Sequence, residues 1–242
     1  MKLKLGMIGS VLVGALAFAG SASATPMNYS YQGAFTQDDN VQLFNFSVTG
    51  AASQVYLVSY GYAGGTQADG TVVSGGGLDT ILTLFNGATG AYITANDDGS
   101  DSCFSGATSV APGIVDGNYD PNTGVRYDTC FSSLINPGNY TVAVTEYDNF
   151  AAGSNLSDGF QRDGQGNFTG ALGGCSQGYF CDVTDATPYN NRTGAWAYDI
   201  LNVSSATQVP QPPTGLPEPG SIALMAIGMI GLGASRRRRP AR

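Results

Sequence analysis

The sequence predicts an all-β fold, a β-sandwich with long glycine-rich loop insertions, and three observations lead to this class. Tyr, Phe, Val, Thr and Ile cluster in short runs whose polarity alternates, as in half-buried strands. Gly, Asp, Asn and Ser separate these runs, as they do where a chain turns. Between the two ends of the chain, no stretch carries a sustained helical repeat of apolar residues. The central part is therefore expected to consist of strands and loops.

Alternation places the expected strands at residues 28–35, 41–48, 54–60, 80–85, 91–95, 140–147 and 195–203. In the second of these, Phe44, Phe46 and Val48 share one face and are expected in the core. The strand at 140–147 is the best defined, because Val142 and Val144 share one face after a Pro-Gly-Asn turn.

Glycine is frequent in this chain, with 35 residues, and concentrates in two stretches, at 61–77 and 153–178. Such stretches are typical of surface loops and not of a core. A disordered linker is the alternative for the second stretch, but its two cysteines indicate that it is tethered.

The N-terminus has the features of a secretory signal peptide. Lys2 and Lys4 precede an uncharged apolar run at 5–20, and Ala22 and Ala24 supply the small residues that a signal peptidase accepts. We expect cleavage after Ala24. The alternative is an uncleaved membrane anchor, which the short apolar run disfavours.

Charge is distributed unevenly along the chain. Between residues 25 and 216 the only cationic side chains are Arg126, Arg162 and Arg192, against seventeen carboxylates. Nucleic acid is therefore not expected as a partner, since phosphate binding needs Lys and Arg. Divalent cations or basic surfaces fit this charge better, while solubility of a secreted protein is the alternative explanation.

All four cysteines lie in the central part, which the signal peptide directs to an oxidising compartment. Four cysteines allow three pairings, and we expect the sequence-local one, Cys103 with Cys130 and Cys175 with Cys181. A zinc site is the alternative. It is disfavoured because the chain has no histidine and no CxxC pair.

Catalysis is not expected from this composition. Histidine is absent and the central part has no lysine, which excludes Ser-His-Asp, Cys-His and Ser-Lys mechanisms. Paired carboxylates remain as the only option, and Glu146 with Asp148 is the nearest candidate for a glycosidase. Trp196, the only tryptophan, is expected in the core of the last strand and not on a sugar-binding surface.

Calcium is the one candidate cofactor. A glycine-bearing turn offers the oxygen ligands that a hard cation prefers, from Asn96, Asp97, Asp98 and Asp101. The spacing does not match an EF-hand, and an Asx-rich hairpin loop without metal is the alternative. Asp38, Asp39 and Asp79 could complete such a site only if the fold brings them near.

The C-terminus carries three unlike elements after a Pro/Ser/Thr linker at 205–215. They are Pro217, Glu218 and Pro219, then a charge-free run ending at Ser235, then Arg236, Arg237, Arg238 and Arg239. The charge-free run would span about 26 Å as a single helix, at the lower limit for a bilayer. The arginines would remain cytoplasmic by the positive-inside rule.

This tail resembles the PEP-CTERM sorting domain of exported Gram-negative proteins, in which a Pro-Glu-Pro motif, a short helix and an Arg cluster address the chain to an exosortase. The resemblance covers residues 216–242. It implies transient residence in the inner membrane, cleavage near Pro217 to Pro219, and delivery to the outer surface or extracellular matrix. An ordinary tail anchor with an accidental Pro-Glu-Pro is the alternative.

Within the central part, DDNVQLFNFSVTG, LDTILTLFNGATGAYITANDDG and LINPGNYTVAVTEYDNF resemble successive landmarks of pre-peptidase C-terminal (PPC-like) domains. These are small jelly-roll sandwiches, so the resemblance implies a jelly-roll-like strand order. It also implies an accessory module, since some of these domains bind calcium or extracellular polymers.

These observations divide the chain into a signal peptide at 1–24, a PPC-like sandwich at 25–204, the linker at 205–215 and a sorting and transmembrane tail at 216–242. We expect a non-enzymatic structural or adhesive protein of the cell surface or biofilm matrix. The expected partners are signal peptidase, exosortase and the inner membrane during export. The alternative is a module that binds exopolysaccharide through tyrosines such as Tyr56, Tyr60 and Tyr62.

Overall fold

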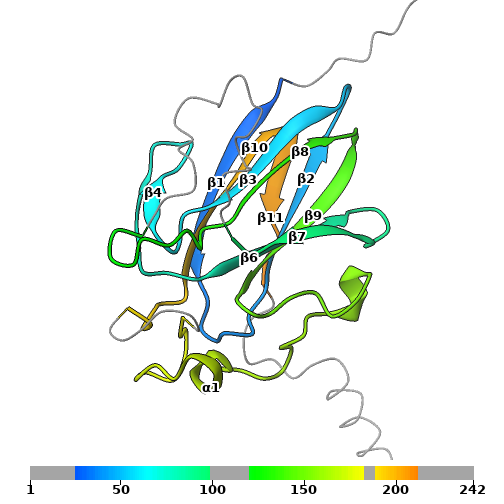
Figure 1. The fold of residues 1–242 in the computed structure, drawn as a ribbon. Helices are drawn as coiled ribbons and strands as arrows, with labels where there is room; N and C mark the ends of the chain where they lie inside the picture. Colours follow the sequence, from blue (N-terminus) through cyan, green and yellow to red (C-terminus); the bar gives the residue numbers. More distant parts are fainter. Residues whose placement is uncertain (1–24, 99–119, 183–188, 212–242) are drawn as a thin grey trace, which may run out of the picture.

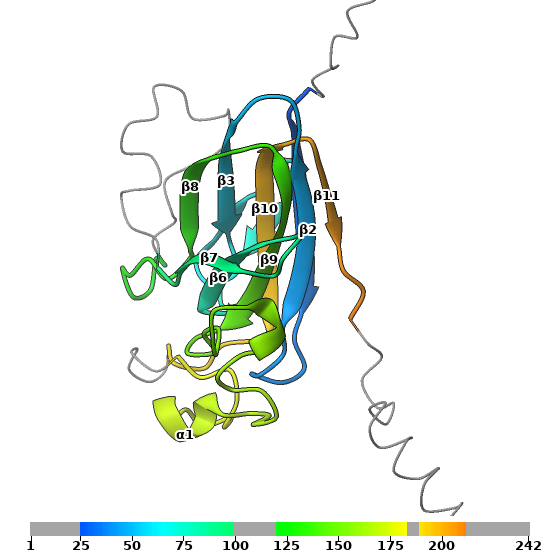
Figure 2. The same ribbon diagram turned by 90° about the vertical axis from the view of Figure 1, so that its right-hand side faces the viewer.

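The computed structural model describes residues 25–98, 120–182 and 189–211 (Figure 1). Two antiparallel sheets pack face to face in this part of the chain, as Figure 2 shows from the side. The four-stranded sheet has the order β1 (Met27–Ala34), β10 (Ala195–Val203), β3 (Ser53–Ser59), β8 (Cys130–Ile135). The five-stranded sheet has the order β11 (Ser205–Gln208), β2 (Gln42–Val48), β9 (Gly138–Glu146), β6 (Thr80–Asn86), β7 (Tyr92–Asn96).

This strand order is that of a jelly roll, because the chain repeatedly crosses from one sheet to the other. Strands β1, β3, β8 and β10 form one sheet, while β2, β6, β7 and β9 form its partner, with β11 added at the outer edge of β2. The all-β sandwich expected from the sequence is therefore confirmed.

The main core lies between the sheets. Phe44, Phe46 and Val48 of β2 are buried there, as their spacing predicts, and Trp196 and Tyr198 of β10 meet them from the other sheet. The outer face of β10 is also covered. There Ala197 and Leu201 join a second cluster, against which part of the hairpin formed by β4 (Gly64–Thr66) and β5 (Val72–Ser74) packs. Strands covered on both faces do not show clean alternation in sequence.

All seven expected strands are present, with ends within two residues of the expected positions. Four strands were not expected: β4, β5, β8 and β11. The boundary drawn at 204 needs correction, since β11 pairs with β2 from Ser205 to Gln208 and extends the sandwich into the expected linker. Its sequence, Ser-Ala-Thr-Gln, is mostly polar because β11 is an edge strand with little to bury.

The glycine-rich stretches carry short elements of their own. The first contains the β4–β5 hairpin, and the second contains η2 (Leu156–Asp158) and α1 (Thr169–Gly173). The loops around α1 lie beneath the strands in Figure 1 and cover that end of the sandwich. Among the described residues, no helix is long and apolar enough to cross a membrane.

Candidate functional site

Carboxylates from distant parts of the chain converge at the end of the sandwich where β6 begins. Thr80, the first residue of β6, pairs with Glu146, the last residue of β9, and Leu82 pairs with Asn96, the last residue of β7. The carboxylates that act on one another at this end are called the acidic cluster: Asp38, Asp79, Asp97, Asp98, Asp128, Glu146 and Asp182.

Asp128 is held by hydrogen bonds from the loop that follows β3. Its carboxylate accepts from the Ser59 hydroxyl at 2.9 Å and from the backbone amides of Tyr62 and Ala63 at 3.0 and 2.8 Å. Burial nevertheless raises the pKa of Asp128 to about 6, because these bonds and Arg192 only partly offset the loss of solvent.

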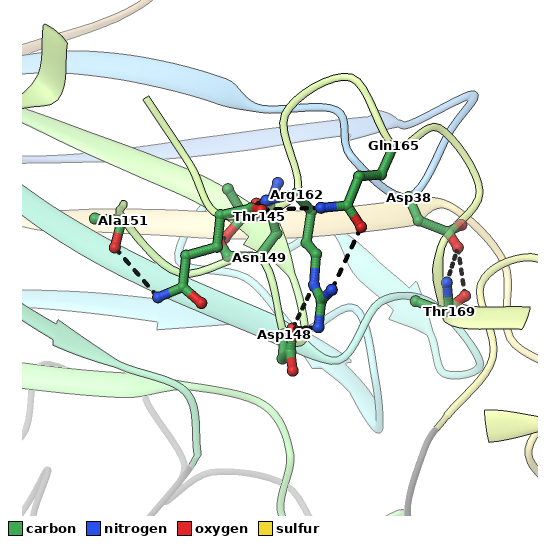
Figure 3. Close-up of polar contacts among 9 residues, drawn as sticks. Asp38, Thr145, Asp148, Asn149, Ala151, Arg162, Gln165 and Thr169 are labelled. Atoms are coloured by element: carbon green, nitrogen blue, oxygen red, sulfur yellow. Dashed lines mark hydrogen bonds and ion pairs between the residues drawn. The ribbon is translucent and has the colours of Figure 1, made fainter. Parts of the chain in front are cut away.

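Asp38 joins the loop between β1 and β2 to the segment that carries α1. Its carboxylate accepts from the Thr169 amide at 2.8 Å and from the Thr169 hydroxyl, as Figure 3 shows. It also accepts from the Phe180 amide at 2.8 Å. The predicted disulfide between Cys175 and Cys181 is confirmed and closes this same segment. Asp38 is fully buried and serves as a structural anchor.

The buried guanidinium at this end belongs to Arg192. It forms an ion pair with Asp120 at 2.9 Å and lies over the ring of Tyr62, 3.5 Å from its centroid. The Tyr62 hydroxyl donates to Asp182. Arg192 therefore neutralises Asp120 directly.

Asp79 and Glu146 stand out in the acidic cluster, because each is buried with one carboxylate oxygen that has no hydrogen-bond partner among the described residues. Their side chains are 4% and 1% exposed, and Asp79 Oδ1 and Glu146 Oε2 have no partner in the described part of the chain. Burial, and then the neighbouring carboxylates, raise the pKa of each well above its usual range. An unpaired buried carboxylate is costly, and two side by side are more so.

The expected calcium ligands are only partly brought to this place. Asp97 and Asp98 directly follow β7 and act on the pKa of Asp79, whereas the Asn96 amide donates to the Cys130 carbonyl at 2.8 Å. Asp101 lies outside the described residues. Among the residues that are described, no three acidic, cysteine or histidine side chains already stand together as a metal site.

Glu146 and Asp148 do not form the carboxylate pair considered for a glycosidase. Glu146 is buried, and Asp148 forms an ion pair with Arg162 at 2.8 Å, which Figure 3 shows next to Gln165.

The tyrosines considered as platforms for sugar stacking are not accessible for that role. Tyr56, Tyr60 and Tyr62 are all buried, because the β4–β5 hairpin and the loops of the acidic cluster cover this part of the four-stranded sheet. The predicted partner of Cys130 is Cys103, which lies outside the described residues, while Cys130 itself is disulfide-bonded. Trp196 lies in the core as expected.

Sequence reasoning missed Glu146, Asp128 and Asp182 as members of the acidic cluster. Glu146 is two residues after Val144 in β9, and both side chains are buried. This alternation could have predicted that Glu146 points into the interior. Asp128 and Asp182 gave no signal, because neither follows a strand that the sequence predicted.

The stability of the protein in a chelating buffer is expected to fall as the pH rises from about 4 through about 6. Asp79, Asp128 and Glu146 hold protons more tightly in the folded state, since their pKa values are raised from 3.8, 3.8 and 4.5. Their contribution is fully present below those unfolded values and is lost as the pH rises through the folded ones, about 6 for Asp128. The loss from Asp128 alone is on the order of 3 kcal/mol.

Thermal unfolding in a chelating buffer across this pH range tests the expectation. Glu146→Gln should flatten the profile, since it removes one of the titrating groups. A melting temperature that rises steadily between these pH values would contradict the expected direction.

Comparison with known proteins bears on the tail. Residues 216–239 match the PEP-CTERM protein-sorting motif. No curated protein and no solved structure gave a significant match to the chain. The residues of the motif, from Pro217, Glu218 and Pro219 to Arg236, Arg237, Arg238 and Arg239, lie outside the described part, as do Ala22 and Ala24 of the expected signal peptide.

Proposed function

We propose that this chain is a non-enzymatic structural or adhesive protein that acts outside the cell after exosortase-type sorting. The observation that carries the proposal is the PEP-CTERM motif at residues 216–239, which supports export through a sorting system of this type. Delivery to the surface of a Gram-negative cell, after passage through the inner membrane, is part of the proposal.

The described domain has properties that suit this role. The described part is a jelly-roll sandwich that contains a disulfide between Cys175 and Cys181. Such a bond stabilises a fold and persists in the oxidising conditions outside the cytoplasm. A polar stretch rich in proline separates β11 from the motif, and such a stretch can act as a spacer. The PPC-like resemblance supports an accessory module and not a catalytic one.

A catalytic role has less support. Glu146 is buried and Asp148 is occupied by Arg162, so the one carboxylate pair that the sequence offered does not face a common substrate. Binding of exopolysaccharide would need aromatic side chains other than those first considered. Among the described residues, Tyr92, Tyr179 and Tyr189 are about half exposed. Affinity electrophoresis in the producer's own polysaccharide would show such binding as retardation.

Sorting is tested by changing the motif in the producing bacterium. We expect the pair Pro217→Ala and Pro219→Ala to keep most of the protein from reaching the surface, because the change removes the motif that directs processing. An epitope inserted after Asp69, in the exposed turn between β4 and β5, would report surface exposure by antibody labelling of intact cells.

The matched control is the pair Pro210→Ala and Pro212→Ala, which changes two prolines upstream of the motif. This control should reach the surface like the unaltered protein. Equal surface labelling of the motif variant and the control would contradict exosortase-type sorting of this chain.

A further inference from the structure

We propose that Asp79 and Glu146 bind a calcium ion together with the carboxylates of Asp97 and Asp98. The proposal rests on the contacts and burial of these side chains and stands whether or not the sorting pathway is as proposed above. It adds a cation site to the sandwich and identifies its fixed ligands.

The two fixed ligands lie at neighbouring strand ends of one sheet, where Glu146 ends β9 and Asp79 directly precedes β6. Glu146 ends β9 opposite Thr80 of β6, and the amide of Tyr147 donates to the Asp79 carbonyl at 2.9 Å. The backbone therefore holds Asp79 and Glu146 next to each other at the strand ends. Asp79 is the neighbour that acts most strongly on the Glu146 carboxyl.

Both carboxylates lack the partners that other buried acids in this chain have. Asp38 accepts three hydrogen bonds, and Asp128 also accepts three, whereas neither Asp79 Oδ1 nor Glu146 Oε2 has a partner among the described residues. Oxygen atoms that are removed from water and left unpaired are suited to coordinate a cation.

Two arginines of the described part have ion pairs with other carboxylates. Arg192 lowers the pKa of Glu146, but its ion pair is with Asp120 and its plane lies over Tyr62. Arg162 is bound to Asp148 and Gln165. The other groups facing Asp79 and Glu146 are acidic: Asp38, Asp97, Asp98, Asp128 and Asp182. A cation at this place would therefore meet attraction from every side of the acidic cluster.

Asp97 and Asp98 do not stand together with the pair as a ready-made site in the described structure, so they would have to move toward it to complete the site. They follow the last residue of β7 at the edge of the sheet, are partly or largely exposed, and accept no hydrogen bond within the described part. Calcium accepts irregular sets of oxygen ligands and tolerates such adaptable loops, whereas magnesium demands a strict octahedron. Two buried ligands at strand ends, together with two more exposed ones after β7, therefore favour calcium.

The test uses the full chain purified in mild detergent, with CaCl2 as the probe and thermal unfolding as the readout. At about 1 mM calcium and pH 8 we expect the melting temperature to rise by about 5–10 °C relative to the calcium-free protein in a chelating buffer. Asp79→Asn combined with Glu146→Gln should abolish this calcium-dependent shift. The same variant should be more stable than the unaltered protein in chelator at pH 8, because two buried charges are removed.

Asp69→Asn is the matched control, because it removes one carboxylate from the exposed β4–β5 hairpin and should keep the full calcium shift. Should the double variant fail to fold, Asp97→Asn with Asp98→Asn replaces it, and calcium affinity measured by calorimetry should fall about tenfold or more. No calcium-dependent shift in the unaltered protein would overturn the proposal. An equal shift with MgCl2, or a shift retained in both variants, would overturn it too.

Discussion

Phe44→Ala is expected to lower the free energy of unfolding by about 3–5 kcal/mol. Phe44 is 0% exposed at the centre of the core between the sheets. Its ring centroid lies 4.7 Å from that of Tyr31, 5.3 Å from Tyr198 and 5.7 Å from Trp196. These neighbours belong to the opposite sheet and are fixed by strand pairing, so they cannot close the cavity that alanine would leave.

Chemical denaturation of the oxidised protein measures this loss. Leu134→Ala is the control, because Leu134 is 67% exposed at the edge strand β8 and should change stability by less than about 0.5 kcal/mol. A loss below about 1 kcal/mol for Phe44→Ala would mean that the two sheets do not depend on this contact.

Asp38→Asn is expected to cost about 2–4 kcal/mol, although the two side chains have nearly the same shape. The Asp38 carboxylate accepts from two backbone amides, those of Thr169 and Phe180, and from the Thr169 hydroxyl. The NH2 group of asparagine is a donor, so it would face one or more of these donors and could not accept a hydrogen bond from them. The segment around α1 should then detach from the β1–β2 loop.

Denaturation and limited proteolysis together measure this effect. Cleavage within residues 162–182 should become faster, since this segment depends on Asp38 for its attachment. Asp158→Asn is the control, because Asp158 is an exposed capping residue of η2 and should cost under about 1 kcal/mol. Unchanged proteolysis in Asp38→Asn would show that other contacts hold the segment.

Strands that bury one face were accessible to sequence reasoning. Phe44, Phe46 and Val48 share a face and lie in the core as expected, because alternation is a local property of the chain. Strands β8 and β11 were not predicted, because their local apolar patterns are weak. Both are edge strands with several exposed or half-exposed residues, so their sequences carry a weak apolar pattern.

The sequence by itself determined the all-β class, the disulfide between Cys175 and Cys181, and the sorting motif at the C-terminus. Each depends on residues that are close together in the chain. Only the tertiary structure decided that Tyr60 and Tyr62 are buried and that Asp79 meets Glu146. Burial and charge interactions depend on which strands become neighbours, and in a jelly roll these neighbours come from distant parts of the sequence.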